Sequence, residues 1–252
     1  MNQFKEIPKH KIKYSEMLQM IKDTGWRVLP LWAYNECGYD EKVLGIRHDI
    51  DVDYGIAKKM ALYEFFRNVQ STYFVLTMHP EYFRLGAVLA NYFAQLNHEV
   101  GIHLDVMSIL IQTPVNVHEH LCNALVGLLQ NGIVVKGSAA HGSAPAIQLK
   151  LPGAEYFYDY CAKEYQIKLQ DAIGQERVLS MGVHFLAEYG LTYEATVMPK
   201  KNYISDSNGI MRINGTEYTR KQAKDALYEF LSTGSGKTIA LFHPIYWNLE
   251  RE

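Results

Sequence analysis

The sequence predicts a protein of the α/β class, in which helices cover a mainly parallel sheet. The first observation is the order of elements, because strand-like and helical patterns alternate along most of the 252 residues. The second is the composition of the strands, since "STYFVL" and "TIALF" are apolar at nearly every position, as in strands buried on both faces. A (β/α) barrel and a doubly wound sheet both fit this length. No linker rich in proline, glycine or serine divides the chain, so we expect a single domain over residues 1–252.

The first half of the chain reads as alternating helices and strands. Ser15 is a suitable N-cap for a helix that ends near Gly25. The runs "RVLPLW" and "KVLGIRH" are strand-like, and Asp53 or Tyr54 then begins a helix with apolar residues at helical spacing. A strand "STYFVLT", a helix with Pro80 near its start and a short strand "HEVGIHLDV" follow.

The second half contains a helix over residues 115–132 that stops at Gly132, and a strand within "IVVKGSAAHGS" that runs into a loop of small residues. Residues 145–215 show no clear periodicity, so we expect irregular excursions there. Thr219 and Gln222 form a capping box for the next helix, and "KTIALFHPIYW" contains the last strand.

Composition and charge favour a cytoplasmic protein without nucleic-acid or membrane partners. The formal net charge is −2 and no run of lysine or arginine occurs, which disfavours nucleic acid and lipid surfaces as partners. The first residues lack the apolar stretch of a signal peptide, and no segment has the length and apolar character to cross a membrane. The three cysteines are widely spaced, as expected of free thiols in a reducing compartment.

Polar residues follow several predicted strands at the point where each strand ends. In parallel α/β folds these ends open onto the functional face. The residues concerned are His48, Asp49, Asp51, His103, Asp105, His141, Asp206 and His243. A carboxylate with several imidazoles is a ligand set suited to a divalent metal such as zinc, with one position left for water.

The stretch "HDIDVD" concentrates carboxylates on one side of an extended chain. Asp49, Asp51 and Asp53 point the same way, because side chains alternate along a strand. Two carboxylates held close together repel unless a cation joins them or one takes up a proton. A metal bound by one and a base role for the other resolves this conflict. Asp53 is better explained as a helix cap.

The other polar residues each have a structural interpretation beside the functional one. His103 is either a ligand or a core histidine bonded to a carbonyl oxygen, and Asp105 either orients a ligand or, the interpretation we prefer, caps the next segment. Asp206 is either functional or part of an Asx-turn before a glycine. For His141 and His243 we favour functional roles, because His141 lies among small residues and His243 follows a strongly apolar strand.

The motifs "HDID", "NHEVGIHLD", "AAHGS" and "LFHP", in this order, resemble those of polysaccharide deacetylases of the NodB-homology (carbohydrate esterase) superfamily. The similarity extends from about residue 43 to residue 247 and is greatest to the divergent branch from bacterial surface-polysaccharide gene clusters. It implies a distorted (β/α) barrel with about seven parallel strands. It also implies that Asp49 is the general base and Asp51 a metal ligand.

The resemblance assigns further roles and contains one departure. His103 matches the first metal histidine and His243 the general acid, but Met107 stands where the family has its second metal histidine. We expect His141 to complete the metal site. The implied cofactor is a divalent metal, with Zn²⁺ as the expected ion.

Together these features predict a metal-dependent hydrolase that removes an acetyl or formyl group from an amino sugar, with a small carbohydrate or sugar-nucleotide as substrate. Arg47 or Asp206 would fix the charge state of the catalytic groups. Tyr246 and Trp247 either stack on a sugar ring or pack at the end of the barrel. Two alternatives stay open: a non-catalytic carbohydrate- or protein-binding scaffold, which Met107 favours, and a hydrolase of a small amide outside carbohydrate metabolism.

Overall fold

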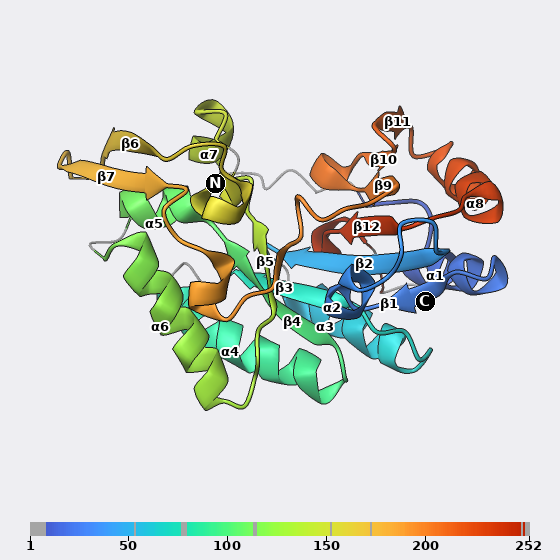
Figure 1. The fold of residues 1–252 in the computed structure, drawn as a ribbon. Helices are drawn as coiled ribbons and strands as arrows, with labels where there is room; N and C mark the ends of the chain where they lie inside the picture. The colour runs from blue at the N-terminus through green and yellow to red at the C-terminus, as the bar shows by residue number, and fades with distance from the viewer. Residues whose placement is uncertain are drawn as a thin grey trace, which may run out of the picture. The chain divides into compact units, whose positions relative to one another are not determined.

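The computed structural model describes residues 9–52, 54–76, 80–112, 115–151, 153–171, 173–247 and 249 (Figure 1). Asp53, which we expected to cap a helix, lies outside these residues. The adjoining Tyr54 is the first residue of α3 (Tyr54–Phe65), so a helix does begin at the predicted place.

The chain divides into two compact units, each assembled from separate stretches of sequence. Unit 1 contains Met1–Tyr73, Gln95–Glu99 and Pro199–Glu252, and unit 2 contains Phe74–Ala94 and Val100–Met198. The chain passes between the units after Met198 and within three elements, which are β3 (Thr72–Leu76), α4 (Pro80–Gln95) and β4 (Glu99–Leu104). The single domain over residues 1–252 stays a prediction.

Unit 1 is built on parallel strands with one antiparallel extension. Its elements are α1 (Tyr14–Asp23), β1 (Arg27–Leu29), α2 (Leu31–Asn35), β2 (Val43–Ile50), α3, β9 (Asn202–Ser205), η4 (Ser207–Gly209), β10 (Met211–Ile213), β11 (Thr216–Tyr218), α8 (Ala223–Thr233), β12 (Thr238–Phe242) and η5 (Pro244–Tyr246). Strand β12 pairs in parallel with β2 and β9, and β1 pairs in parallel with β2. Strands β10 and β11 continue from β9 in antiparallel order.

The strands at the centre of unit 1 are buried along their whole length. Every residue of β2 and of β12 is buried, as expected for strands whose apolar side chains are covered on both faces. Helix α1 adds Met17, Leu18 and Ile21 to the core, and Trp26 and Trp247 fill it further. This rigid packing fixes the positions of the polar residues at the end of β2.

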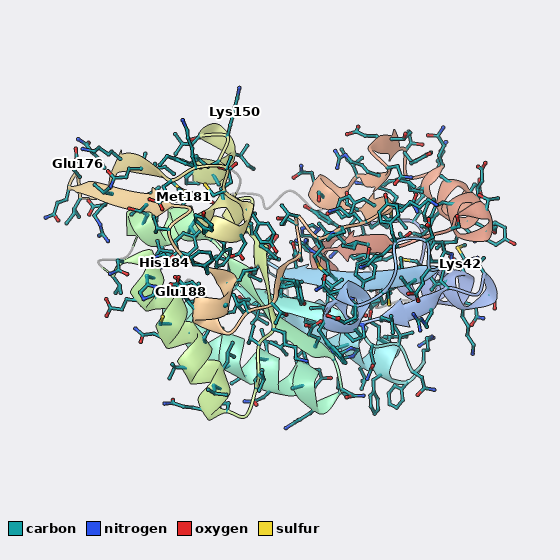
Figure 2. The ribbon with its side chains drawn as sticks, in the orientation of Figure 1. Lys42, Lys150, Glu176, Met181, His184 and Glu188 are labelled. Atoms are coloured by element: carbon teal, nitrogen blue, oxygen red, sulfur yellow. The ribbon has the colours of Figure 1, made fainter. Side chains whose placement is uncertain are left out.

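Unit 2 combines parallel strands with helices and one hairpin. Its elements are α5 (Val106–Gln112), α6 (Val117–Gln130), β5 (Gly137–Ala140), α7 (Ala144–Gln148), η1 (Gly153–Tyr156), η2 (Tyr158–Tyr160), β6 (Tyr165–Gln170), β7 (Glu176–Met181), η3 (Leu186–Tyr189) and β8 (Tyr193–Glu194). Strand β5 pairs in parallel with β4 and with β8, and β6 pairs with β7 in antiparallel order. Figure 2 shows Glu176 at the end of this hairpin and Lys150 after α7 pointing away from unit 2.

The predicted α/β class and the mainly parallel central sheet are confirmed. Closure of the strands into a barrel of about seven strands stays a prediction. Among the described residues, no helix combines the length and apolar character required to cross a membrane. The three cysteines are free and half-buried.

Several predicted boundaries are wrong for local reasons. Helix α1 begins at Tyr14 rather than after Ser15, because the Glu16 carboxylate accepts a hydrogen bond from the Lys13 backbone N–H and so caps the helix earlier. The run "RVLPLW" is a strand only up to Leu29, since Pro30 is the N-cap of α2. The helix α5 after β4 and the hairpin β6–β7 were not predicted at all.

Candidate functional site

Strand β2 of unit 1 presents an ion pair at its C-terminal end. Arg47 and Asp49 lie two residues apart, so their side chains share one face of the strand. Arg47 Nε donates to Asp49 Oδ1 at 3.0 Å and Nη2 donates to Oδ2 at 2.6 Å. Both side chains are almost completely buried, at 2% and 4% exposed. This bidentate contact holds the carboxylate in one orientation and compensates its charge.

Asp51 follows directly after β2 and lies beside His243. The distance from Asp51 Oδ2 to His243 Nε2 is 4.0 Å, and the Asp51 side chain is 32% exposed. Asp51 is therefore the more accessible of the two carboxylates, which suits a group that binds a ligand from solvent. The burial and ion pair of Asp49 suit a group that must keep its orientation.

Asp206 holds His243 in a fixed orientation and protonation state. His243 Nδ1 donates to Asp206 Oδ1 at 2.7 Å, and the His243 backbone N–H donates to the same carboxylate at 3.0 Å. Burial alone would lower the pKa of His243, but the hydrogen bond and charge of Asp206, with the charges of Asp49 and Asp51, raise it to about 9. The imidazole is thus protonated at neutral pH, with its Nε2–H on the side of Asp51.

Two further side chains surround Asp206, which is fully buried. Trp247 Nε1 donates to Asp206 Oδ2 at 2.9 Å, and His10 Nε2 lies 3.6 Å from the same oxygen. Burial would raise the pKa of Asp206, but its contacts with His10 and His243 lower it. Asp206 is therefore more than the Asx-turn residue that the sequence allowed, because its carboxylate bonds with the side chains of distant residues.

Of the two aromatic residues expected to stack on a sugar, only one is accessible. Trp247 is 0% exposed and packs in the core of unit 1, so of its two alternatives the structure favours packing over stacking on a ligand; its indole N–H donates to Asp206. Tyr246 is half-buried, and its ring centroid lies 5.8 Å from that of His243. Tyr246 can therefore contact a ligand that reaches His243.

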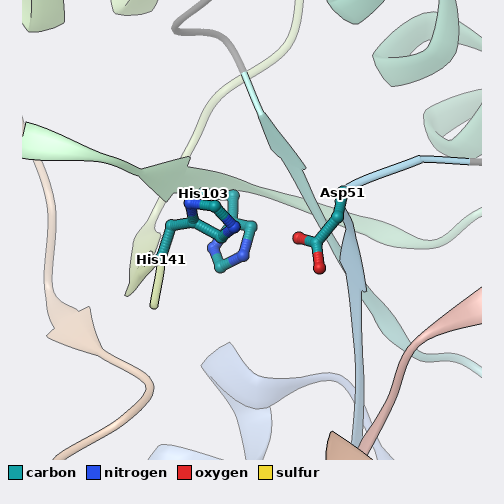
Figure 3. Close-up of side chains that lie close together, drawn as sticks. All are labelled: Asp51, His103 and His141. Carbon is teal, nitrogen blue, oxygen red and sulfur yellow. The ribbon is translucent and has the colours of Figure 1, made fainter. Parts of the chain in front are cut away.

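Unit 2 brings His103 of β4 and His141, the residue after β5, side by side (Figure 3). Their ring centroids are 4.8 Å apart and the rings meet edge to face. His103 Nδ1 donates to the Ala139 carbonyl oxygen at 2.9 Å, and His141 Nδ1 donates to Asp105 Oδ2 at 2.9 Å. Both contacts place the proton on Nδ1 and the lone pair on Nε2, which is the tautomer that binds a metal through Nε2.

Asp105 orients His141 and also caps α5. Its Oδ1 accepts hydrogen bonds from the Ser108 backbone N–H at 3.0 Å and from Ser143 Oγ at 2.9 Å. Burial would raise the pKa of Asp105, but the hydrogen bonds from His141 and Ser108 lower it. Asp105 therefore caps α5, as we preferred, and it also orients an imidazole, whose role as a metal ligand stays a prediction.

Met107 occupies the place where the resemblance leads us to expect a second metal histidine. It lies in the first turn of α5 and is 0% exposed. Its side chain is part of the core of unit 2, so the position contributes packing instead of a ligand. His141, contributed by the neighbouring strand, is the imidazole that lies next to His103.

A second buried polar cluster lies in unit 1, centred on Glu64 of α3, and was not predicted. The carboxylate accepts hydrogen bonds from the hydroxyls of Tyr14, Ser71 and Tyr73 and pairs with His48 Nε2 at 2.9 Å. One signal was present. Glu64 continues the buried face of α3 formed by Ala57, Met60 and Ala61, and a charged residue at a core position requires polar partners.

Comparison with known proteins gives structural neighbours only. No family model matches the chain, and no curated protein matches it. Two solved structures that it resembles are of a CE4 family pseudoenzyme from Bacillus anthracis. One is a mutant with restored enzymatic activity (10% identity, TM-score 0.42, covering 82% of this chain and 58% of that chain) and the other is the wild type (9%, 0.41, 82% and 56%).

A third neighbour is the catalytic domain of peptidoglycan N-acetylglucosamine deacetylase from Eubacterium rectale (14% identity, TM-score 0.39, covering 83% of this chain and 79% of that chain). This chain thus spans less than two thirds of the pseudoenzyme's length and most of the deacetylase domain. Structures of the CE4 family are among its neighbours at low identity.

Proposed function

We propose that this protein is a metal-dependent hydrolase that removes an acetyl or formyl group from an amino sugar. Asp51 and the imidazoles of His103 and His141 would bind one divalent metal ion, as the resemblance of their motifs leads us to expect. They offer one carboxylate oxygen and two imidazole nitrogens, a donor set that zinc accepts with a position left for water. The tautomers fixed by Ala139 and Asp105 support this assignment.

The observation that carries the proposal is the arrangement at the end of β2. A buried, oriented carboxylate (Asp49), an accessible carboxylate (Asp51) and a protonated imidazole (His243) all belong to unit 1. Hydrolysis of an amide requires a base for the attacking water and an acid for the departing nitrogen. Asp49 and His243 are the groups that supply these functions.

When bound, the metal would lower the pKa of a bound water toward ~7 and polarise the acyl oxygen. Asp49 accepts the proton of that water as the new C–O bond forms, while Arg47 keeps the carboxylate in place. His243 Nε2–H donates its proton to the nitrogen as the C–N bond breaks. Asp206 stabilises the imidazolium before this transfer.

The finer features of the function are also proposals. The motifs quoted above support a carbohydrate substrate, and the accessible ring of Tyr246 supports a contact with a sugar near His243. A small carbohydrate or sugar-nucleotide, a cytoplasmic location and zinc as the ion are what the sequence leads us to expect. The burial of Met107 favours a second candidate, a barrel relative that has lost its metal and acts as a binding scaffold.

Metal content and activity together test the proposal. The purified protein, loaded with Zn²⁺ and freed of excess, should contain one metal ion per chain and release acetate from N-acetylated amino sugars. Asp51→Asn should lose the metal and the activity. The matched variant Asp49→Asn should keep the metal and lose the activity, because Asp49 acts on the water. A wild-type protein that takes up no metal would support the scaffold, and full metal content in Asp51→Asn would refute the assignment of Asp51.

A further inference from the structure

The peptide group between Ala139 and Ala140 in β5 has a polar partner on each side. On one side, the Ala139 carbonyl oxygen accepts the proton of His103 Nδ1 at 2.9 Å. On the other, the Ala140 N–H donates to Oε1 of Glu194 at 2.6 Å. Because C=O and N–H of a trans peptide point in opposite directions, one peptide group joins the carboxylate to the imidazole.

Strand pairing explains how this contact arises. Strand β5 lies between β4 and β8, with His103 opposite Ala139 and Glu194 opposite Ser138. Strand β8 ends at Glu194, so its backbone does not continue as far as Ala140. The Glu194 side chain therefore takes the place of the missing backbone acceptor.

Glu194 is a buried carboxylate that accepts several hydrogen bonds. It is 1% exposed. Besides the Ala140 N–H, it accepts hydrogen bonds from the backbone N–H of Thr196 at 2.9 Å and from the Thr196 hydroxyl. A neutral acceptor for the Ala140 N–H would be enough to complete the strand pairing. Burying a charged carboxylate there costs free energy unless the charge has a function or strong hydrogen-bond partners.

We propose that Glu194 is a positioning residue for the metal ligand His103 and acts on it through the Ala139–Ala140 peptide. This inference rests on the proposed function. The negative charge on Glu194 polarises the peptide, because hydrogen bonds in a chain strengthen one another. The Ala139 oxygen then becomes a stronger acceptor for the His103 Nδ1 proton, which makes Nε2 a better metal donor.

Each of the two imidazoles would then have a carboxylate that strengthens it as a metal ligand. His141 receives a carboxylate directly, from Asp105, and His103 receives one through a peptide group, from Glu194. A direct carboxylate partner of a metal histidine typically contributes ~10–100-fold in metal affinity. Since the peptide group transmits only part of this effect, we expect Glu194 to increase the metal affinity by roughly 3–10-fold.

The first test measures the hydrogen bond in protein without metal. In wild-type protein, the Ala140 amide proton and the His103 Nδ1 proton should both resonate far downfield in the NMR spectrum, and the Ala140 amide should exchange slowly. Glu194→Gln should move the His103 Nδ1 proton upfield and leave the His141 Nδ1 proton in place. Should the variant not fold, the wild-type spectrum decides: an ordinary position for either proton overturns the proposal.

The second test measures Zn²⁺ affinity by competition with a chelating dye. Glu194→Gln should bind Zn²⁺ roughly 3–10-fold more weakly, and Asp105→Asn ~10–100-fold more weakly. The control is Glu64→Gln, which alters an equally buried carboxylate of unit 1 and should lower stability without changing affinity. If Glu194→Gln keeps wild-type affinity and an unshifted His103 proton, Glu194 only completes the strand. If the wild-type protein binds no metal, the proposed function fails, while the NMR measurement still decides the role of Glu194.

Discussion

Replacing Glu64 by glutamine should destabilise unit 1 in a way that depends on pH. Burial would raise the pKa of Glu64, but the charge and hydrogen bond of His48, then His98 and Tyr14, lower it to about 2. An unfolded glutamate titrates near ~4.3, so the folded state favours the ionised form by about 3 kcal/mol at neutral pH. Because the folded pKa is the lower one, this stabilisation is present above the unfolded pKa and is lost as the pH falls toward 2.

The expected difference between the wild type and Glu64→Gln is therefore about 3 kcal/mol at pH 7 and about 2 kcal/mol at pH 3.5. Urea unfolding followed by tryptophan fluorescence measures it, because Trp26, Trp32 and Trp247 all belong to unit 1. Glu16→Gln is the matched control. The Glu16 carboxylate pairs with Lys224 at the surface, and such pairs contribute about 0–1 kcal/mol. A gap between wild type and Glu64→Gln that stays constant from pH 7 to pH 3.5 would refute the reasoning.

Two other substitutions test the site and the sheet. Asp206→Asn should lower kcat by about 10²-fold with little change in metal content, because His243 loses the carboxylate that keeps it protonated. Steady-state kinetics and elemental analysis measure the two quantities. An unchanged kcat would contradict the prediction. Gly137→Ala should cost about 1–3 kcal/mol, since its Cβ would lie 2.0 Å from the ring of Tyr193, and thermal unfolding followed by circular dichroism measures the loss. Wild-type melting would mean that the ring has room to move.

The sequence allowed candidate site residues to be predicted where polar side chains directly follow an apolar strand. Asp49, Asp51 and His243 could be singled out as candidates because charged or imidazole side chains directly follow apolar strands. His141 could be singled out because it lies among small residues after a strand. The pairing of His141 with Asp105 was accessible only in part, since the same aspartate also fits the start of a helix, and it has both roles.

The residues that the sequence did not reveal depend on long-range packing. Glu194 lies on a two-residue strand within a stretch that has no clear periodicity, and its partner Ala140 is distant in sequence. For Trp247 the sequence left stacking on a ligand and packing both open, and only the structure places it in the core of unit 1. Neither outcome follows from local preference, because each is decided by which strands become neighbours.

The interleaving of the two units has a consequence for synthesis on the ribosome. Strand β2, with Arg47 and Asp49, is made long before its parallel neighbour β12. The whole of unit 2 lies between them in the sequence. The pairing of β2 with β12 therefore has to wait until the later strand has been made. A nascent chain halted before Asp206 would already contain His103 and His141, but it would lack both His243 and the carboxylate that orients it.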